Sequence, residues 1–407
     1  MKKISILSVC FAVGLTASAQ MDLVKQVDKA KPGTPDEYIA LRAQILPALE
    51  NTESSGVAQT WYVAGKVEYD FFDQMFLAKS VGQQADVSEM AKTLVNGYNY
   101  YVKALPLDSI PNEKGKIKPK YSKDIVNTVI ANYVHCYTLG YELNGIGDYK
   151  GAFDLWTVFQ EIGANPMFSA KIPEGIKEQL TDTLIAENAF HRACAATLAE
   201  MYEEAFAAYD LAYNAGYKDK MLFEYAISTA QTVQNFDQMV HFAELAMPLY
   251  GSENSIYLEI IIQKYLQDEN YEGALAYVND AIEVNPENPA YYVARGKIYD
   301  NKKEYKTALV DYAKAIELNP ENAHARYCYG RCLYEDINLI NEEASTKPQK
   351  EYEEILTTQI EPMLKEATVH LEKAVELDEN QTDAIRYLRN IYYMLGDSAN
   401  LERVSAM

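Results

Sequence analysis

The sequence has few cysteines and few histidines for its length. Its 407 residues include five of each. Four cysteines lie beyond the N-terminal region, Cys136, Cys194, Cys328 and Cys332. So few thiols in a chain of this length argue against a disulfide framework. We therefore expect side-chain packing, and not covalent cross-links, to stabilise the fold.

Sequence patterns that carry known chemistry are also missing. The chain has no phosphate-binding glycine loop, no nucleophile elbow and no HExxH helix. The best metal candidate is the set His324, Cys328 and Cys332, whose spacing places all three along one face of a helix. No fourth ligand is identifiable nearby, and buried thiols commonly act as small apolar side chains. We predict no cofactor, no metal site and no enzymatic activity.

Positive charge is in deficit, since 37 lysines and arginines face 59 aspartates and glutamates, which gives a formal net charge of -22. A phosphate backbone would be repelled by such a chain, so we predict that nucleic acid is not a partner. Beyond the first residues no run approaches the ~20 apolar residues that a membrane-spanning helix needs. We predict no transmembrane span.

The N-terminus has the pattern of a secretory leader. Lys2 and Lys3 precede an apolar run at residues 4–15, and small residues follow at Ala17 and Ala19. This pattern predicts a signal peptide over residues 1–19, with a periplasmic or extracellular destination. An uncut N-terminal anchor and a lipidated Cys10 are the alternatives, and the apolar run that continues past Cys10 disfavours the second. Removal of the two lysines would leave a net charge of -24.

The strongest signal is internal repetition. Residues 290–321 form two amphipathic helical patterns joined by a short turn. Small residues alternate with tyrosines at the places where the two helices should cross, and a proline ends the unit: Tyr292, Gly296, Tyr299, Tyr305, Ala308, Tyr312, Ala315 and Pro320. Small residues allow close approach of two backbones, and the aromatic rings fill the space beside them.

The same pattern recurs upstream at about one period per copy. Three further copies are recognised by their small and aromatic positions, at Leu258 to Pro286, Phe223 to Gly251 and Ala189 to Ala212. These residues resemble the tetratricopeptide repeat (TPR) family, whose unit is a pair of helices about 34 residues long. The resemblance implies an all-α, right-handed superhelical solenoid, here of about seven repeats.

The resemblance also suggests a division of the chain. In order, we expect a signal peptide (1–19), an N-terminal helical segment (20–54), two long degenerate repeats (55–166) with an exposed loop at 109–120, four regular repeats (182–322), a repeat with a helical insertion (323–378) and a C-terminal capping helix with a tail (379–407). The sequence ASAQ across the expected cleavage site, residues 17–20, resembles the ends of signal peptides of Bacteroidetes.

TPR proteins hold peptides or partner helices in a concave groove lined by the first helix of each pair, which implies a protein-binding scaffold in the cell envelope. A small-molecule or glycan-capturing repeat protein is the alternative. Removing the packing positions from the first helices leaves a basic, tyrosine-bearing strip as the candidate peptide-binding site: Lys297, His324, Tyr327, Arg331, Arg386 and Asn390. Such a strip would attract an acidic segment. Whether this groove or the insertion at 335–361 binds the partner stays open, as does the oligomeric state.

The leader generates a first testable prediction. Export should be followed by cleavage before Gln20, because Ala17 and Ala19 suit a signal peptidase. Intact-mass measurement of the exported protein should therefore give a chain that begins at residue 20. Retention of Met1, or a diacylglyceryl group on Cys10, would contradict the prediction.

Overall fold

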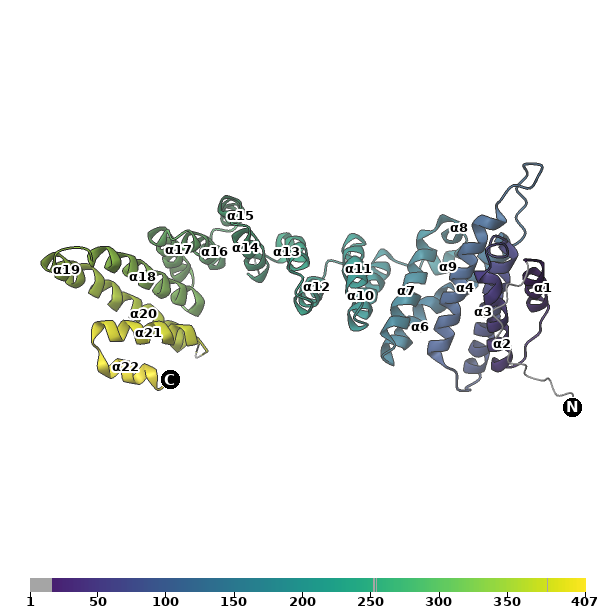
Figure 1. The fold of residues 1–407 in the computed structure, drawn as a ribbon, viewed down its shortest axis with the longest axis horizontal. Coiled ribbons are helices and arrows are strands. Elements are labelled where there is room, and N and C mark those ends of the chain that lie inside the picture. The colour runs from purple at the N-terminus through teal and green to yellow at the C-terminus, as the bar shows by residue number, and fades with distance from the viewer. Residues whose placement is uncertain (1–16, 252, 254, 379) are drawn as a thin grey trace. The chain divides into compact units, whose positions relative to one another are not determined.

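The computed structural model describes residues 17–251, 253, 255–378 and 380–407. Throughout these residues the secondary structure is helical and contains no strand, which confirms the predicted all-α class (Figure 1). The chain forms two compact units, residues 1–225 and 226–407, and within each unit consecutive helices pack against one another. The predicted signal peptide lies outside the described residues up to position 16.

The first unit contains eleven helices in the described chain, five of which exceed fifteen residues. Their bounds are α1 Ala17–Asp28, α2 Pro35–Glu50, α3 Ala58–Ser80, α4 Val87–Asp108, α5 Ser122–Ala131, α6 Tyr133–Gly145, α7 Tyr149–Ala164, α8 Pro166–Ser169, α9 Glu174–Lys177, α10 Asp182–Leu198 and α11 Tyr202–Asn214. Residues 109–121 join α4 to α5 without helix, where the sequence predicts an exposed loop. The helix α12, Lys220–Thr232, contains the boundary between the units.

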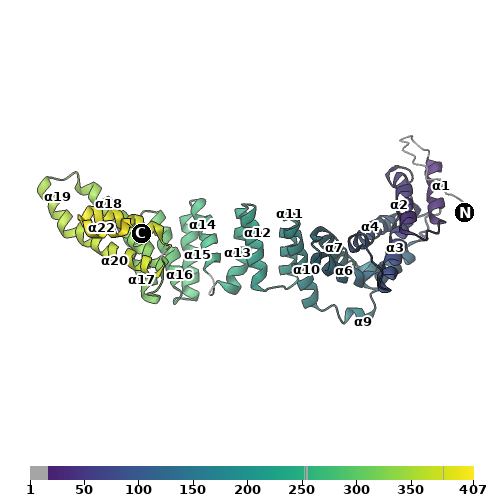
Figure 2. The same ribbon diagram turned by 90° about the horizontal axis from the view of Figure 1, so that it is seen from below.

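The second unit follows the same pattern with shorter helices. They are α13 Phe236–Tyr250, α14 Ile256–Gln267, α15 Tyr271–Val284, α16 Pro289–Asn301, α17 Tyr305–Leu318, α18 Ala323–Ala344, α19 Gln349–Ile355, η1 Leu356–Ile360, α20 Glu361–Leu377, α21 Thr382–Leu395 and α22 Ser398–Ser405. In Figures 1 and 2 the long helix α18 lies beside α20, with α19 at the far end of this hairpin.

One turn geometry recurs within the helix pairs. In six turns, a residue with φ between 53° and 83° stands two positions before the second helix: Gly147, Glu200, Gln234, Glu269, Lys303 and Gly396. The amide of the next residue then donates to a carbonyl five residues back, at 2.8 or 2.9 Å, as from Asn270 to Tyr265 and from Glu304 to Tyr299. This is the left-handed helix cap of a Schellman motif, which ends one helix and aims the next.

The helix crossings pair small residues with rings, as the repeat pattern predicts. A Cβ on Gly296 would stand 2.7 Å from the ring of Tyr312, and one on Gly140 would stand 2.2 Å from the indole of Trp156. Ala308 is fully buried in the same cluster as Tyr312. Because the rings occupy the space that a Cβ would need, only glycine permits these backbone distances at positions 296 and 140.

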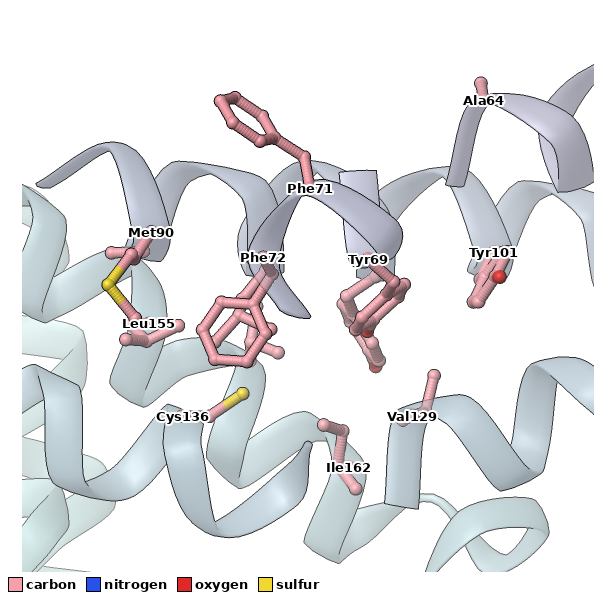
Figure 3. Close-up of a cluster of buried hydrophobic side chains, with 14 of the residues drawn as sticks. Ala64, Tyr69, Phe71, Phe72, Met90, Tyr101, Val129, Cys136, Leu155 and Ile162 are labelled. Atoms are coloured by element: carbon pink, nitrogen blue, oxygen red, sulfur yellow. The ribbon is translucent and has the colours of Figure 1, made fainter. Parts of the chain in front are cut away.

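Aromatic and aliphatic side chains from α3, α4, α6 and α7 form the core of the first unit. Figure 3 shows Tyr69, Phe72, Met90 and Leu155 converging between these helices. At the edge of this core, the Arg42 guanidinium bonds both Glu68 and Glu89, and so joins α2 to α3 and α4. Glu68 is 3 % exposed, and desolvation raises the pKa of its carboxyl to about 7.

The predicted insertion is a helical hairpin. Its second arm, formed by α19, η1 and α20, is locally widened at η1. Pro348 stands at the turn before α19, and the wider π-type segment η1 precedes Pro362. Pro362 has no amide hydrogen, and the Thr357 and Thr358 hydroxyls donate to the carbonyls of Glu353 and Glu354. Both features disturb the regular helical ladder and explain the wider turn.

The predicted cleavage site falls near the start of α1. Cleavage before Gln20 would remove the first three residues of this helix. The remainder is well anchored, since Gln20, Val24 and Val27 are all buried. No helix in the described stretches has both the length and the apolar composition required to cross a bilayer.

The recurring turn generates a second prediction. Glu269 holds φ at 53°, a region that costs residues with a Cβ about 1 kcal/mol and costs glycine little. Glu269→Gly should therefore stabilise the second unit, by roughly 0.5 to 1 kcal/mol after the greater freedom of glycine in the unfolded chain is deducted.

Gln263→Gly is the matched control, because Gln263 is also exposed but lies inside α14. It should destabilise the unit by about 1 kcal/mol. Urea denaturation of both variants measures the difference. If Glu269→Gly destabilises the protein as much as Gln263→Gly does, the role assigned to this turn is wrong.

Candidate peptide-binding groove

The candidate groove lies in the second unit, along the first helices of successive pairs. Two clefts, of about 270 and 470 Å³, share Lys297 and His324 in their linings. The smaller cleft is lined from α14 and α16 by Glu259, Ile262 and Val293, among others. Because two residues are common to both linings, the clefts form one groove that passes from α14 across α16 to α18.

Four of the six residues predicted for the site line this groove. Lys297 and His324 line both clefts, and Tyr327 and Arg331 line the larger one. Lys297 projects from α16 and is exposed, with no ion pair to any residue that the structure describes. The structure therefore places an unpaired cation where the two clefts meet.

Arg331 is bound within the protein. Its guanidinium forms an ion pair with Asp300, which is 7 % exposed and also accepts a hydrogen bond from the Tyr312 hydroxyl at 3.2 Å. Tyr312 is the ring that packs against Gly296. The pair thus ties α16, α17 and α18 together, and its charges largely cancel within the wall of the larger cleft.

The structure places Arg386 and Asn390 on α21, outside the linings of both clefts. Arg386 forms an ion pair with Asp383 at 3.3 Å, and its guanidinium lies 5.3 Å from the ring centre of Tyr387. The ring centre of Tyr387 in turn lies 6.3 Å from that of Tyr327, and the Tyr387 hydroxyl donates to Glu335 at 3.5 Å, so α21 contacts two residues that line the larger cleft.

His324 and the two cysteines of α18 do not form a ligand set. The Cys328 sulfur lies 3.6 Å from His324 Nε2, whereas the Cys332 thiol donates to the carbonyl of Tyr305. Burial raises the pKa of Cys328 to about 12, which keeps the thiol neutral. Among the residues that the structure describes, no group of three or more His, Cys, Asp or Glu side chains is arranged to hold a metal ion.

The groove also shifts the pKa of His324. Desolvation by the surrounding walls lowers the pKa of His324 below its usual 6.5, Glu259 opposes this shift and Lys297 adds to it. His324 is consequently neutral at pH 7. The positive charge in this part of the groove therefore comes from lysine.

Sequence reasoning missed several groove residues, of which Glu259, Lys303 and Glu335 are charged. Glu259 lines the smaller cleft from α14, and Lys303 lines the larger one from the turn before α17. Lys303 has φ of 62° and occupies the left-handed cap position. The repeat register places a turn residue two positions before each second helix, so the position of Lys303 could have been identified from the sequence. The direction of its side chain could not, because it depends on backbone geometry that helical periodicity does not describe.

No protein-family model matches the chain, and no curated protein matches it. Solved structures do match. YrrB, described as a TPR protein with an unusual peptide-binding site, is 18% identical with a TM-score of 0.32, and the match covers 52% of this chain and 95% of YrrB.

Two further structures show similar resemblance. An IFIT1 monomeric mutant bound to Gppp-AAAA is 15% identical with a TM-score of 0.40, and the match covers 95% of this chain and 77% of that one. The TPR2AB domain of yeast Sti1, in its pHSP90 complex, is 13% identical with a TM-score of 0.26, and the match covers 81% of this chain and 97% of that one.

The contrast between the two arginines generates a third prediction. Arg331→Ala would leave Asp300 buried without its counter-ion, so it should destabilise the second unit by about 2 kcal/mol or more. Arg386→Ala, which removes an exposed pair, should change stability by no more than about 0.5 kcal/mol. Thermal or urea denaturation compares the two variants, and equal stabilities would contradict the structural role given to Arg331.

Proposed function

We propose that the protein is an exported peptide-binding scaffold that holds an extended segment of a partner protein in the groove of its second unit. The observation that supports this role is the continuity of the two clefts through Lys297 and His324. A groove built from consecutive first helices is long enough to take several residues of extended chain.

The two clefts differ in chemistry, which suggests what such a segment contains. Ile262, Val293 and Ala294 give the smaller cleft apolar walls suited to an aliphatic side chain. Lys297 and Lys303 both line the larger cleft, where a carboxylate would gain a charge-assisted hydrogen bond. We therefore expect a partner segment with an apolar residue followed or preceded by an acidic one.

This proposal refines the basic strip inferred from the sequence. Arg331 has a buried acidic partner within the chain, so it offers no free charge to a ligand, and Arg386 lies outside the linings of both clefts. Lys297 remains a candidate to pair with an acidic ligand group, and Lys303 is a second candidate. The role is one of binding, and burial keeps the Cys328 thiol in the groove neutral and therefore a weak nucleophile.

The groove generates a fourth prediction. Two pooled decapeptide libraries, one with a central Asp and one with a central Lys, are otherwise randomised among Leu, Val, Tyr, Ser and Gly. In fluorescence polarisation the Asp library should bind more tightly. Lys297→Glu should weaken its binding by about tenfold or more, equivalent to about 1.4 kcal/mol.

Lys350→Glu is the control, because it makes the same change in charge on α19, outside both clefts. It should leave binding within about twofold, since exposed charges at a distance are screened. Circular dichroism of both variants should match that of the parent. Equal weakening by the two substitutions, or no preference for the Asp library, would refute the groove as the binding site.

A further inference from the structure

A separate cleft in the first unit has features of a small-molecule site. Residues 165–181 connect α7 to α10 and contain the single-turn helices α8 and α9. Comparable connections in the second unit are much shorter, at residues 285–288 and 319–322. The longer connection covers part of the space between α7, α10 and α11, and a cleft of about 490 Å³ lies beneath it.

The walls of this cleft are mostly apolar. Phe159 and Tyr133 line one side, with their rings stacked at 4.7 Å and 11°. Ile185 and Leu211 line the cleft with 39 % and 43 % of their surface exposed, so apolar area here faces solvent. A cleft of this size and composition lies within the range of sites that bind small molecules.

The uncharged polar side chains of the lining are Tyr133, Gln160 and Ser169. The Gln160 side chain donates from Nε2 to Asn188 at 3.4 Å, while its Oε1 atom has no hydrogen-bond partner within the described chain. The Tyr133 hydroxyl lies 3.0 Å from the position that a Cβ on Gly163 would take. A buried acceptor without a partner is costly, and a ligand N–H or O–H at this wall would relieve that cost.

Lys177 is the charged side chain of the lining. It belongs to α9, in the long connection, and its ammonium is 3.7 Å from Glu174 in a pair exposed at both ends. An exposed pair of this kind contributes little, so Lys177 is available to an anionic ligand. In a chain of net charge -22, a cation beside an apolar cleft favours ligands with an acidic group.

From this arrangement we propose that the cleft binds a small aromatic carboxylic acid whose ring carries a hydrogen-bond donor. The ring lies against the apolar walls, the donor bonds Gln160 Oε1, and the carboxylate pairs with Lys177. This site is independent of the peptide groove, because it lies entirely within the first unit. Failure of either proposal leaves the other to be judged on its own experiment.

Three probes separate the parts of this proposal. Indole-3-acetate carries a ring, an N–H donor and a carboxylate; tryptamine replaces the carboxylate with a cation; naphthalene-1-acetate lacks the donor. Isothermal titration of the full chain should show saturable binding of indole-3-acetate. Tryptamine should bind at least about tenfold more weakly because its charge is reversed, and naphthalene-1-acetate should also bind more weakly because Gln160 stays unpaired.

Variants test the location. Ala164→Phe adds a ring at an exposed position in the lining and should abolish binding of indole-3-acetate, whereas Ala207→Phe adds the same ring at an exposed position on α11 outside the lining and should not. Lys177→Gln should reduce the preference for indole-3-acetate over tryptamine. No binding of indole-3-acetate below about 1 mM, equal binding of tryptamine, or unchanged binding by Ala164→Phe would overturn the site. Equal binding of naphthalene-1-acetate would overturn the donor contact.

Discussion

The left-handed turn that joins the two helices of a pair is the constraint on which the rest of the structure depends. It ends one helix and starts the next after a fixed number of residues, with the same backbone hydrogen bond each time. Because that geometry is fixed, the small residue on the first helix meets the ring on the second, as Gly296 meets Tyr312. Close packing then follows from local rules applied pair by pair.

The same packing fixes the wall of the groove. Tyr312 fills the space beside Gly296 and also donates to Asp300, which holds Arg331 of the next pair. The wall of the larger cleft is therefore fixed by residues that serve the fold. Lys297, one turn before Asp300 on α16, projects from this rigid wall without an internal partner among the described residues. A rigid surface with a few uncommitted polar groups is the arrangement that binding sites require.

The sequence was informative wherever one helix pair determines the outcome. Gly296, Ala308 and Tyr312 could be assigned as contact positions because their spacing repeats. The pairing of Arg331 with Asp300 could not, because it joins two pairs and depends on how they stack. The turn residues Glu269 and Lys303 could not be recognised as left-handed from the sequence, because neither is a glycine. The cleft beneath residues 165–181 also could not be predicted, because that connection has no helical periodicity.

As proposed above, the groove from α14 to α18 holds an acidic peptide. Hydrogen–deuterium exchange of the full chain, with and without an Asp-containing decapeptide selected from the library, tests it most directly. Bound peptide should slow amide exchange in α14, α16 and the first turns of α18, and leave α15 and α17 nearly unchanged. Protection confined to residues 335–361, or to the first unit, would contradict this account.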